Sequence, residues 1–512
     1  MNVVTKRSAV RARQQRLIKA GVAGCIAIAT LAAPAFADNA SDVQALKEHL
    51  RLMQQKLDQL STPQTTGTVA APAPTNAATQ ATDERKRKET PALTYAGITL
   101  YGTVDLNVAY ITHGAPLSSS WGPGLPSFIQ NYSNKSITSV GGNGLSQSKV
   151  GLSGVEPLWF GDLNGVFRLE TGFDPWSGRL VDAAGSLVAD NGRSAATKIA
   201  SGDSSREGQP FQGAAYAGIS SKTYGTLTFG RQNGLELDNL AKYDPQLQSQ
   251  AFSPIGLSGN AGGLGNTESN RLDNSLKYVV GVGPVRFAYM HAFGSDGYVP
   301  GNANEVDVGA DMHGVSVDAL WGHINGAVSA TSLSAAQFAT PGIAPNSLAA
   351  TISDNTSWGL NLSYNAKEYF PIKFYAGWER VKYANPKHPD PAGTVGLGGY
   401  ILSVTNNTAF TINRIMQYSW VGARWSVVPE FDLTLAYYQY NQKSNAANGC
   451  SDTSAGTCAG ELHDGSLVAD YHWTKRFDTY LGVNYSLVQD GLASGFLFKN
   501  EFSPALGVRF NF

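Results

Sequence analysis

Residues 506–512 read LGVRFNF and end the chain on a strict alternation of apolar and other side chains. The apolar set is Leu506, Val508, Phe510 and Phe512. Successive side chains of a β-strand point to opposite faces, so this stretch predicts a strand with one apolar and one polar face. The stretch ITLYGTVDLNVAY at residues 98–110 predicts a second strand of the same kind. Its apolar positions of one parity are Leu100, Val104, Leu106, Val108 and Tyr110.

Fourteen further strands are expected between these two stretches. They lie near residues 145–155, 163–173, 211–220, 225–232, 271–280, 284–293, 303–311, 314–323, 355–365, 370–383, 410–425, 430–442, 461–473 and 476–487. With the two ends they make sixteen, and an even count suits a single-chain bacterial barrel whose termini share one side. The predicted fold class is an all-β, transmembrane, sixteen-stranded antiparallel barrel.

The expected connections alternate between short and long along the chain. The short ones lie near residues 221–222, 281–283, 312–313, 427–429 and 474–475. The long ones cover residues 111–144, 174–210, 233–270, 324–354, 384–409, 443–460 and 488–503, with a modest one at 294–302. Outer-membrane barrels have tight periplasmic turns and extended outer loops. A large secreted all-β protein is the alternative, but it gives no reason for loops to be sorted by face.

The N-terminus has the pattern of an export signal. A basic stretch over residues 6–19 precedes an apolar segment and the small-residue site AFA at residues 35–37. This order predicts a secretory signal peptide over residues 1–37. A lipobox at residues 22–25 would instead make Cys25 an acylated N-terminus, although the apolar run before it is shorter than the about 7 to 15 residues of a signal core. Both alternatives predict export.

Composition restricts how the exported chain can enter a membrane. After residue 37 no run of 18 uncharged apolar residues occurs, so no spanning helix is expected. Charged residues make up only 15% of the chain and aromatic residues 10%, which fits strands that alternate between lipid and water. Removing the six basic residues of the signal from the 38 in the chain leaves 32 against 39 acidic residues. The resulting net charge of −7 gives no indication of nucleic-acid binding.

Residues 38–60 place apolar side chains at alternating steps of three and four. These are Val43, Leu46, Leu50, Met53, Leu57 and Leu60. The spacing predicts a short coiled-coil helix, with an amphipathic helix packed on its own barrel as the alternative. Residues 61–96 are rich in Pro, Thr and Ala and predict a disordered linker. Residues 97–512 then form the barrel domain.

Two cysteines remain after the signal, Cys450 and Cys458, in a segment rich in Gly, Ser, Thr and Asn. Exported proteins meet an oxidising environment, so a disulfide that closes this loop is predicted. A zinc site is the weaker alternative, because only His463 lies nearby to complete it. No metal or other cofactor is expected.

Several strand motifs resemble those of the Gram-negative trimeric porins, especially the β-proteobacterial general porins. The motifs are LYGTVD at residues 100–105, SKVGLSG at 148–154, FRLETGF at 167–173, FGRQ at 229–232 and RLDNS at 271–275. Their order on successive strands extends the resemblance over residues 97–512. The heptads resemble an N-terminal extension of some substrate-specific trimeric porins, including dicarboxylate-type ones.

The resemblance implies a homotrimer in the cell outer membrane, in contact with lipid and lipopolysaccharide, with the coiled coil in the periplasm. It also implies a third outer loop that folds into the lumen and a water-filled channel for passive diffusion of small hydrophilic solutes and ions. The alternative is a substrate-specific porin for small organic acids, for example dicarboxylates. Liposome swelling with sugars, amino acids and dicarboxylates would separate the two.

Strand parity predicts which charges point into the lumen. The residues turned inward by their apolar neighbours are Lys149, Arg168, Glu170, Arg271, Asp273 and Lys277. A charge on the lipid face would cost roughly 2 to 4 kcal/mol at the membrane midplane. The resemblance to the porin family also implies a ladder of basic side chains on the inner wall, with one residue from each of strands two, four and six. Lys149 and Arg271 match it, whereas the middle position falls at Gly213.

The expected constriction combines this wall with acids of the third loop. On the wall the candidates are Lys149, Arg168 and Arg271, with Arg168 rebuilding part of the charge missing at Gly213. On the loop, Asp238 and Asp244 match acidic positions of the family and Glu236 adds a charge nearby. Gln248 stands where the family has a further acid, so the transverse field is expected to be milder than in a typical general porin.

An enzyme is the competing class, because some outer-membrane barrels are lipases or proteases. Such an enzyme needs a nucleophile and a base within hydrogen-bond reach. The histidines are scattered and no local Ser/His signature occurs, so no catalytic residue is expected. A role of the outer loops in adhesion would be secondary.

Overall fold

The computed structural model describes residues 93–114, 135–194, 197, 210–257, 271–294, 301–389, 391–397, 399–443 and 449–512. The expected signal peptide, the coiled coil and residues 61–92 of the linker lie outside this range. The last linker residues lie inside it: Leu93–Tyr95 form β1, which pairs antiparallel with the first residues of the next strand. These residues are therefore part of a hairpin.

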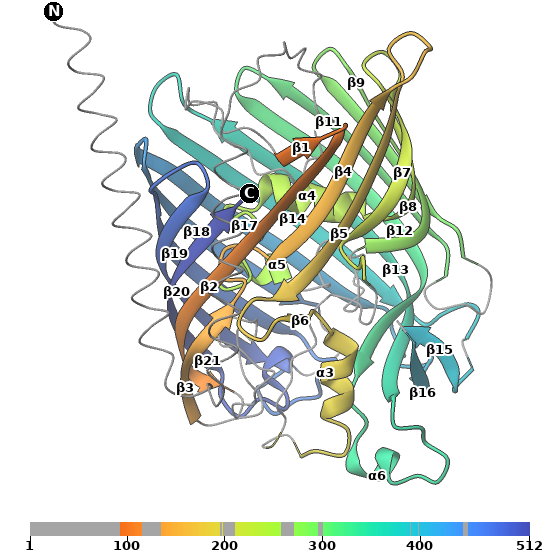
Figure 1. The fold of residues 1–512 in the computed structure, drawn as a ribbon. Coiled ribbons are helices and arrows are strands. Elements are labelled where there is room, and N and C mark those ends of the chain that lie inside the picture. Colours follow the sequence, from red (N-terminus) through yellow and green to blue (C-terminus); the bar gives the residue numbers. More distant parts are fainter. Residues whose placement is uncertain are drawn as a thin grey trace, which may run out of the picture. The chain divides into compact units, whose positions relative to one another are not determined.

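Sixteen strands form a closed antiparallel barrel, as predicted (Figure 1). They are β2 (Ile98–Gly114), β4 (Lys149–Pro157), β5 (Asn164–Asp174), β7 (Ala214–Ser221), β8 (Gly225–Asn233), β9 (Arg271–Val282), β10 (Val285–Ala292), β11 (Ala303–Met312), β12 (Val315–Thr331), β13 (Ser347–Asn365), β14 (Ile372–Ala384), β17 (Arg414–Val428), β18 (Phe431–Gln442), β19 (Gly460–His472), β20 (Phe477–Asp490) and β21 (Asn500–Asn511). Each strand pairs with its successor in this order, and β2 pairs with both β4 and β21.

The seam between β2 and β21 closes the barrel. The backbones of Gly102 and Phe512 exchange two hydrogen bonds of 3.0 Å. Next to them, the hydroxyl of Thr103 donates to the side-chain oxygen of Asn511 at 2.8 Å. The ring of Phe512 lies over Gly102, where a Cβ atom would stand 2.4 Å from it. The absence of a side chain at residue 102 therefore makes room for the end of the chain.

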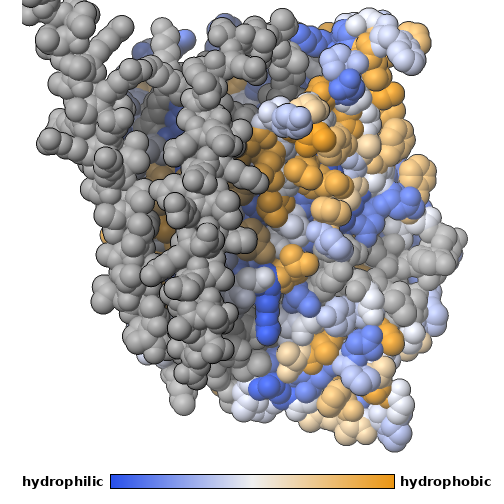
Figure 2. Space-filling model, viewed as in Figure 1, coloured by the Kyte–Doolittle hydropathy of each residue, from blue (hydrophilic) through white to orange (hydrophobic). Residues whose placement is uncertain are grey.

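The wall alternates between exposed apolar and buried polar side chains. On β13, the outward Trp358 and Leu360 are exposed, while the inward Ser357 and Asn361 are buried. Figure 2 shows apolar side chains gathered over the middle of the visible wall. No helix in the described part of the chain is both long and apolar enough to cross a membrane.

The long connections carry short elements that were expected to be loop. These are β3 (Lys135–Gly142), β6 (Arg179–Leu180), α3 (Ala183–Ala189), α6 (Ala335–Phe338), β15 (Thr394–Leu397), β16 (Tyr400–Asn406) and the 3-10 helix η2 (Gly491–Ala493). β3 pairs with the C-terminal half of β2, residues 106–114, while β4 pairs with its N-terminal residues 98–103. β3 and β4 therefore cover β2 as one interrupted strand.

The largest differences from the predicted strand ends, eight residues each, lie in β12 and β13. The strand expected at residues 314–323 continues to Thr331, and the one expected at residues 355–365 already begins at Ser347. The reason is that β12 and β13 go on pairing beyond the wall of the barrel. There they share an apolar core with α3 and β16. Its buried members are Ala184, Leu187, Val328, Ala330, Leu348, Ala350, Ile352 and Leu402. α3, α6, β15 and β16 lie together at this end of the barrel (Figure 1).

Candidate functional site

The third long connection runs through the inside of the barrel. It contains α4 (Leu235–Tyr243) and α5 (Pro254–Leu257), which the strands surround in Figure 1. Residue Gly234 precedes α4 and has no side chain to cap the helix. The carboxylate of Glu305 on β11 accepts hydrogen bonds from the backbone N–H groups of Leu235 and Glu236 instead. A carboxylate at a helix N-terminus also interacts favourably with the helix dipole, so the wall itself caps α4.

The other end of α4 is held by β12 and by an aromatic cluster. The ammonium of Lys242 lies 2.9 Å from a carboxylate oxygen of Asp318, and the hydroxyl of Tyr243 donates to the same carboxylate. Burial lowers the pKa of Lys242, and Asp318 opposes that shift. Leu240 packs among aromatic side chains of β14, β17 and β18. The indole N–H of Trp420 donates to the carbonyl of Tyr243 at 3.0 Å.

Beyond α4 the connection continues across the lumen as residues 244–252. Asp244 is fully buried and accepts hydrogen bonds from the hydroxyl of Tyr438 at 2.6 Å and from the backbone of Gln248 at 2.8 Å. Burial raises the pKa of Asp244, and the bond from Tyr438 opposes that shift. The buried ring of Phe252 packs edge-on against Tyr480 on β20. Together with the contacts of α4, the connection is thus attached to the wall from β11 and β12 to β20.

Two glycines of the wall leave space for this connection. A Cβ atom on Gly422 would lie 2.4 Å from Pro245, and one on Gly482 would lie 2.6 Å from Phe252. Both contacts are shorter than real side chains tolerate. The inner surface of β17 and β20 is therefore shaped to hold the connection against it.

The wall candidates converge on one carboxylate. Glu170 on β5 lies 3.4 Å from the ammonium of Lys149 and 2.6 Å from the guanidinium of Arg168. The charge of Arg271 also acts on Glu170. The hydroxyl of Tyr101 on β2 donates to Glu170 at 3.0 Å. Lys149 and Arg168 therefore share a single buried acid.

Glu170 also explains why Gly213, the middle position of the expected ladder of basic wall residues, has no side chain. A Cβ atom on Gly213 would lie 2.9 Å from a carboxylate oxygen of Glu170. The acid occupies the space that a longer side chain would need. Strand parity indicated that Glu170 points inward, but not that it fills this position.

The three loop candidates lie in different surroundings. Glu236 is buried and accepts a hydrogen bond from the hydroxyl of Ser357. Asp244 is buried within its own turn, as described above. The side chain of Asp238 keeps 20% of its exposure and forms an ion pair with Lys277.

A family model for Gram-negative porins matches residues 65–491. The chain belongs to the Gram-negative porin family. It is accordingly an outer-membrane channel for passive diffusion. No curated protein sequence matches it.

Solved structures show that the porin shares its fold with distant relatives. The anion-selective porin of Comamonas acidovorans is 18% identical, with a TM-score of 0.53, and covers 81% of this chain and 99% of its own. A loop L8 deletion mutant of OmpT, an outer membrane protein of Vibrio cholerae, is 12% identical, with a TM-score of 0.50 and the same coverage.

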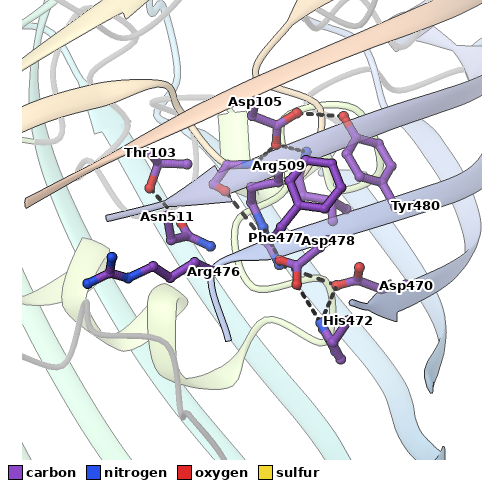
Figure 3. A network of polar contacts seen from close by, with 12 residues as sticks. Thr103, Asp105, Asp470, His472, Arg476, Phe477, Asp478, Tyr480, Arg509 and Asn511 are labelled. Atoms are coloured by element: carbon purple, nitrogen blue, oxygen red, sulfur yellow. Dashed lines mark hydrogen bonds and ion pairs between the residues drawn. The ribbon is translucent and has the colours of Figure 1, made fainter. Parts of the chain in front are cut away.

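A second charged network joins β18, β19, β20 and β21 close to the short turn at residues 473–476 of the porin (Figure 3). Arg509 on β21 lies 2.8 Å from Asp478 and 3.3 Å from Asp470. His472 lies 2.7 Å from Asp478 and 3.0 Å from Asp432. Asp470, His472 and Asp478 are close enough to hold a metal ion, the one such group among the described residues. The guanidinium of Arg509 already supplies a cation to both carboxylates, so the geometry is that of an ion-pair network.

The two predicted loop cysteines lie between β18 and β19 of the porin. Cys450 and Cys458 are joined by a disulfide, with their Cα atoms 5.8 Å apart. Close by, the side-chain amide of Gln442 on β18 donates to the carbonyl of Gly456 at 2.7 Å. The bridge therefore closes a short outer loop that is also bonded to the wall.

Proposed function

We propose that small hydrophilic solutes and ions cross the porin through a constriction between α4 and the wall of β4, β5 and β9. The observation that carries the proposal is that Lys149 and Arg168 both form ion pairs with Glu170, and that the charge of Arg271 acts on the same carboxylate, in a lumen crossed by a loop that is fixed to β11, β12 and β20. Lys149 and Arg168 keep 28% and 19% side-chain exposure, so water and solutes can reach them.

The loop acids have separate roles in this proposal. Asp238 is the acid that faces the passage, because it is the most exposed of the three. Glu236 and Asp244 hold the loop in place through Ser357 and Tyr438. Arg231 and Asp273 form an ion pair beside Arg271 and offset each other, so the three cations near Glu170 give the constriction excess positive charge and a mild preference for anions.

A substrate-specific channel for small organic acids is the second candidate, favoured by the cluster of wall cations. Liposome swelling tests it against general diffusion. Rates that fall with solute size alone, equally for sugars, amino acids and dicarboxylates, support general diffusion. A dicarboxylate rate that exceeds that of a sugar of equal size and saturates with concentration supports the specific channel.

The porin is proposed to work as a homotrimer in the outer membrane, in contact with lipid and lipopolysaccharide. Residues 38–60 would associate as a coiled coil in the periplasm, and no catalytic role is ascribed to the protein. The exposed apolar side chains of the wall support burial against lipid or neighbouring barrels. Migration of unboiled protein as a monomer in SDS gels would contradict the trimer, and deletion of residues 38–60 tests whether the coiled coil is needed for it.

A further inference from the structure

One row of residues crosses the inner wall from β2 over β4 to β5. Tyr101 on β2 is the register partner of Gly151 on β4, and Gly151 is the partner of Glu170 on β5. A Cβ atom on Gly151 would lie 2.4 Å from the ring carbon Cζ and from the hydroxyl of Tyr101. The ring of Tyr101 therefore lies across Gly151, and in this position its hydroxyl reaches Glu170 at 3.0 Å.

The guanidinium of Arg168 lies over this ring. Its Cζ atom is 4.9 Å from the centre of the Tyr101 ring, a cation–π contact. One of its terminal nitrogens also donates to the carboxylate of Glu170 at 2.6 Å. Two different contacts, one with the ring and one with the acid, therefore hold the guanidinium in one orientation.

Most of the hydrogen-bonding capacity of Arg168 is unused. A guanidinium carries five N–H donors, and the bond to Glu170 is the one hydrogen bond that this side chain makes within the described residues. The side chain keeps 19% of its exposure, so it can be reached from the lumen. A planar guanidinium with free N–H groups matches the two oxygens of a carboxylate.

We propose that Arg168 recognises the carboxylate groups of small organic anions in the passage, and that Tyr101 positions Arg168 for this contact. The inference rests on the proposed constriction and names the class of solute that it favours. Lys149 pairs with the same Glu170 and adds a second positive charge there. The compact ammonium of Lys149 attracts any anion, whereas the flat fork of Arg168 distinguishes a carboxylate from a spherical ion such as chloride.

The test uses succinate as a blocker of chloride current through single channels in planar bilayers. Arg168→Lys keeps the charge but removes the fork. The half-blocking succinate concentration should therefore rise about fivefold, the effect of one lost hydrogen bond, while the reversal potential in a potassium chloride gradient stays near the wild-type value. Arg193→Lys makes the same exchange at an exposed side chain after α3 and should change neither quantity.

Two substitutions of Tyr101 separate positioning from a merely structural role. Tyr101→Leu removes the ring and should raise the half-blocking concentration about threefold. Tyr101→Phe keeps the ring and should be blocked nearly like the wild type. Both variants lose the hydroxyl that donates to Glu170, so the difference between them reports the ring contact alone. If Tyr101→Leu is blocked like Tyr101→Phe, Tyr101 does not position Arg168.

The recognition of carboxylates has its own contradicting results. An Arg168→Lys channel that is blocked like the wild type would overturn it, and so would a wild-type channel that succinate does not block. If Lys149→Ala and Arg271→Ala still shift the reversal potential in either case, the proposed constriction stands without it. If they do not, both proposals fail.

Discussion

Glu170 shows how much a single side chain can decide in this lumen. Alternation of apolar residues on β5 predicted that it points inward, and the same rule applied to Lys149 and Arg168. The sequence could not predict that these charges meet, because the contacts of Glu170 with Lys149 on β4 and with Arg168 on β5 depend on side-chain conformations. Nor could the sequence explain Gly213: the Glu170 carboxylate occupies the space that a side chain at residue 213 would need.

Substitution of Glu170 tests its effect on ion selectivity. Glu170→Gln keeps the shape and the acceptor for Tyr101 but removes the acid that pairs with Lys149 and Arg168. The permeability ratio of chloride to potassium should rise about threefold. Glu156→Gln, at the exposed end of β4, loses the same charge outside the cluster and is the matched control. Equal ratios for both variants would show that Glu170 does not screen the wall.

Asp244 is predicted to act as a structural acceptor in the loop. Asp244→Asn retains an oxygen for the Tyr438 hydroxyl, so its channel should conduct like the wild type. Asp244→Ala removes the acceptor of that hydroxyl and of the backbone N–H of Gln248, at a cost of about 1–3 kcal/mol for each buried group. Single-channel recordings should then show a noisier and larger current. A quiet, unchanged Asp244→Ala channel would contradict the role of this anchor.

At the scale of elements, α4 depends on a residue far away in the sequence. Its own N-terminus offers only Gly234, and the cap comes from Glu305 on β11. Sequence patterns indicate caps that lie within a few residues of a helix, so this one could not be predicted. The inward course of the loop was predicted through the family resemblance, whereas its anchors became visible only in three dimensions.

Removal of this cap should loosen α4. Glu305→Ala takes away a carboxylate whose interaction with a helix N-terminus is worth about 0.3–2 kcal/mol. The folded barrel should persist, while open-channel noise should increase. Glu368→Ala, in the exposed turn before β14, is the control that should behave like the wild type. If the two variants record alike, α4 does not need Glu305.

The strands observed in the structure agree with those predicted from the sequence wherever one face of the strand meets lipid. Alternation predicted the sixteen barrel strands because the lipid face excludes polar side chains at every second position. It failed for the outer parts of β12 and β13, since residues such as Val328 and Ile352 pack against α3 instead of lipid. An apolar core formed between loops has no periodic pattern from which it could be predicted.

At the scale of the whole molecule, closure of the barrel depends on the fit between Gly102 and Phe512. A Cβ atom on Gly102 would also lie 2.6 Å from the carbonyl of Lys149, a backbone atom that cannot move aside cheaply. An overpacked contact lowers the free energy of unfolding by about 1–3 kcal/mol. Gly102→Ala should therefore lower the temperature at which the barrel unfolds in SDS gels. Gly165→Ala on β5, whose nearest neighbour would be 3.9 Å away, should not. Equal unfolding temperatures would contradict the fit.

The central claim is that the wall cations near Glu170 control what passes through the porin. The reversal potential across a planar bilayer in a potassium chloride gradient tests it most directly. The wild-type channel should favour chloride mildly, and both Lys149→Ala and Arg271→Ala should shift the potential toward potassium. Unchanged selectivity and conductance in both variants would contradict the claim.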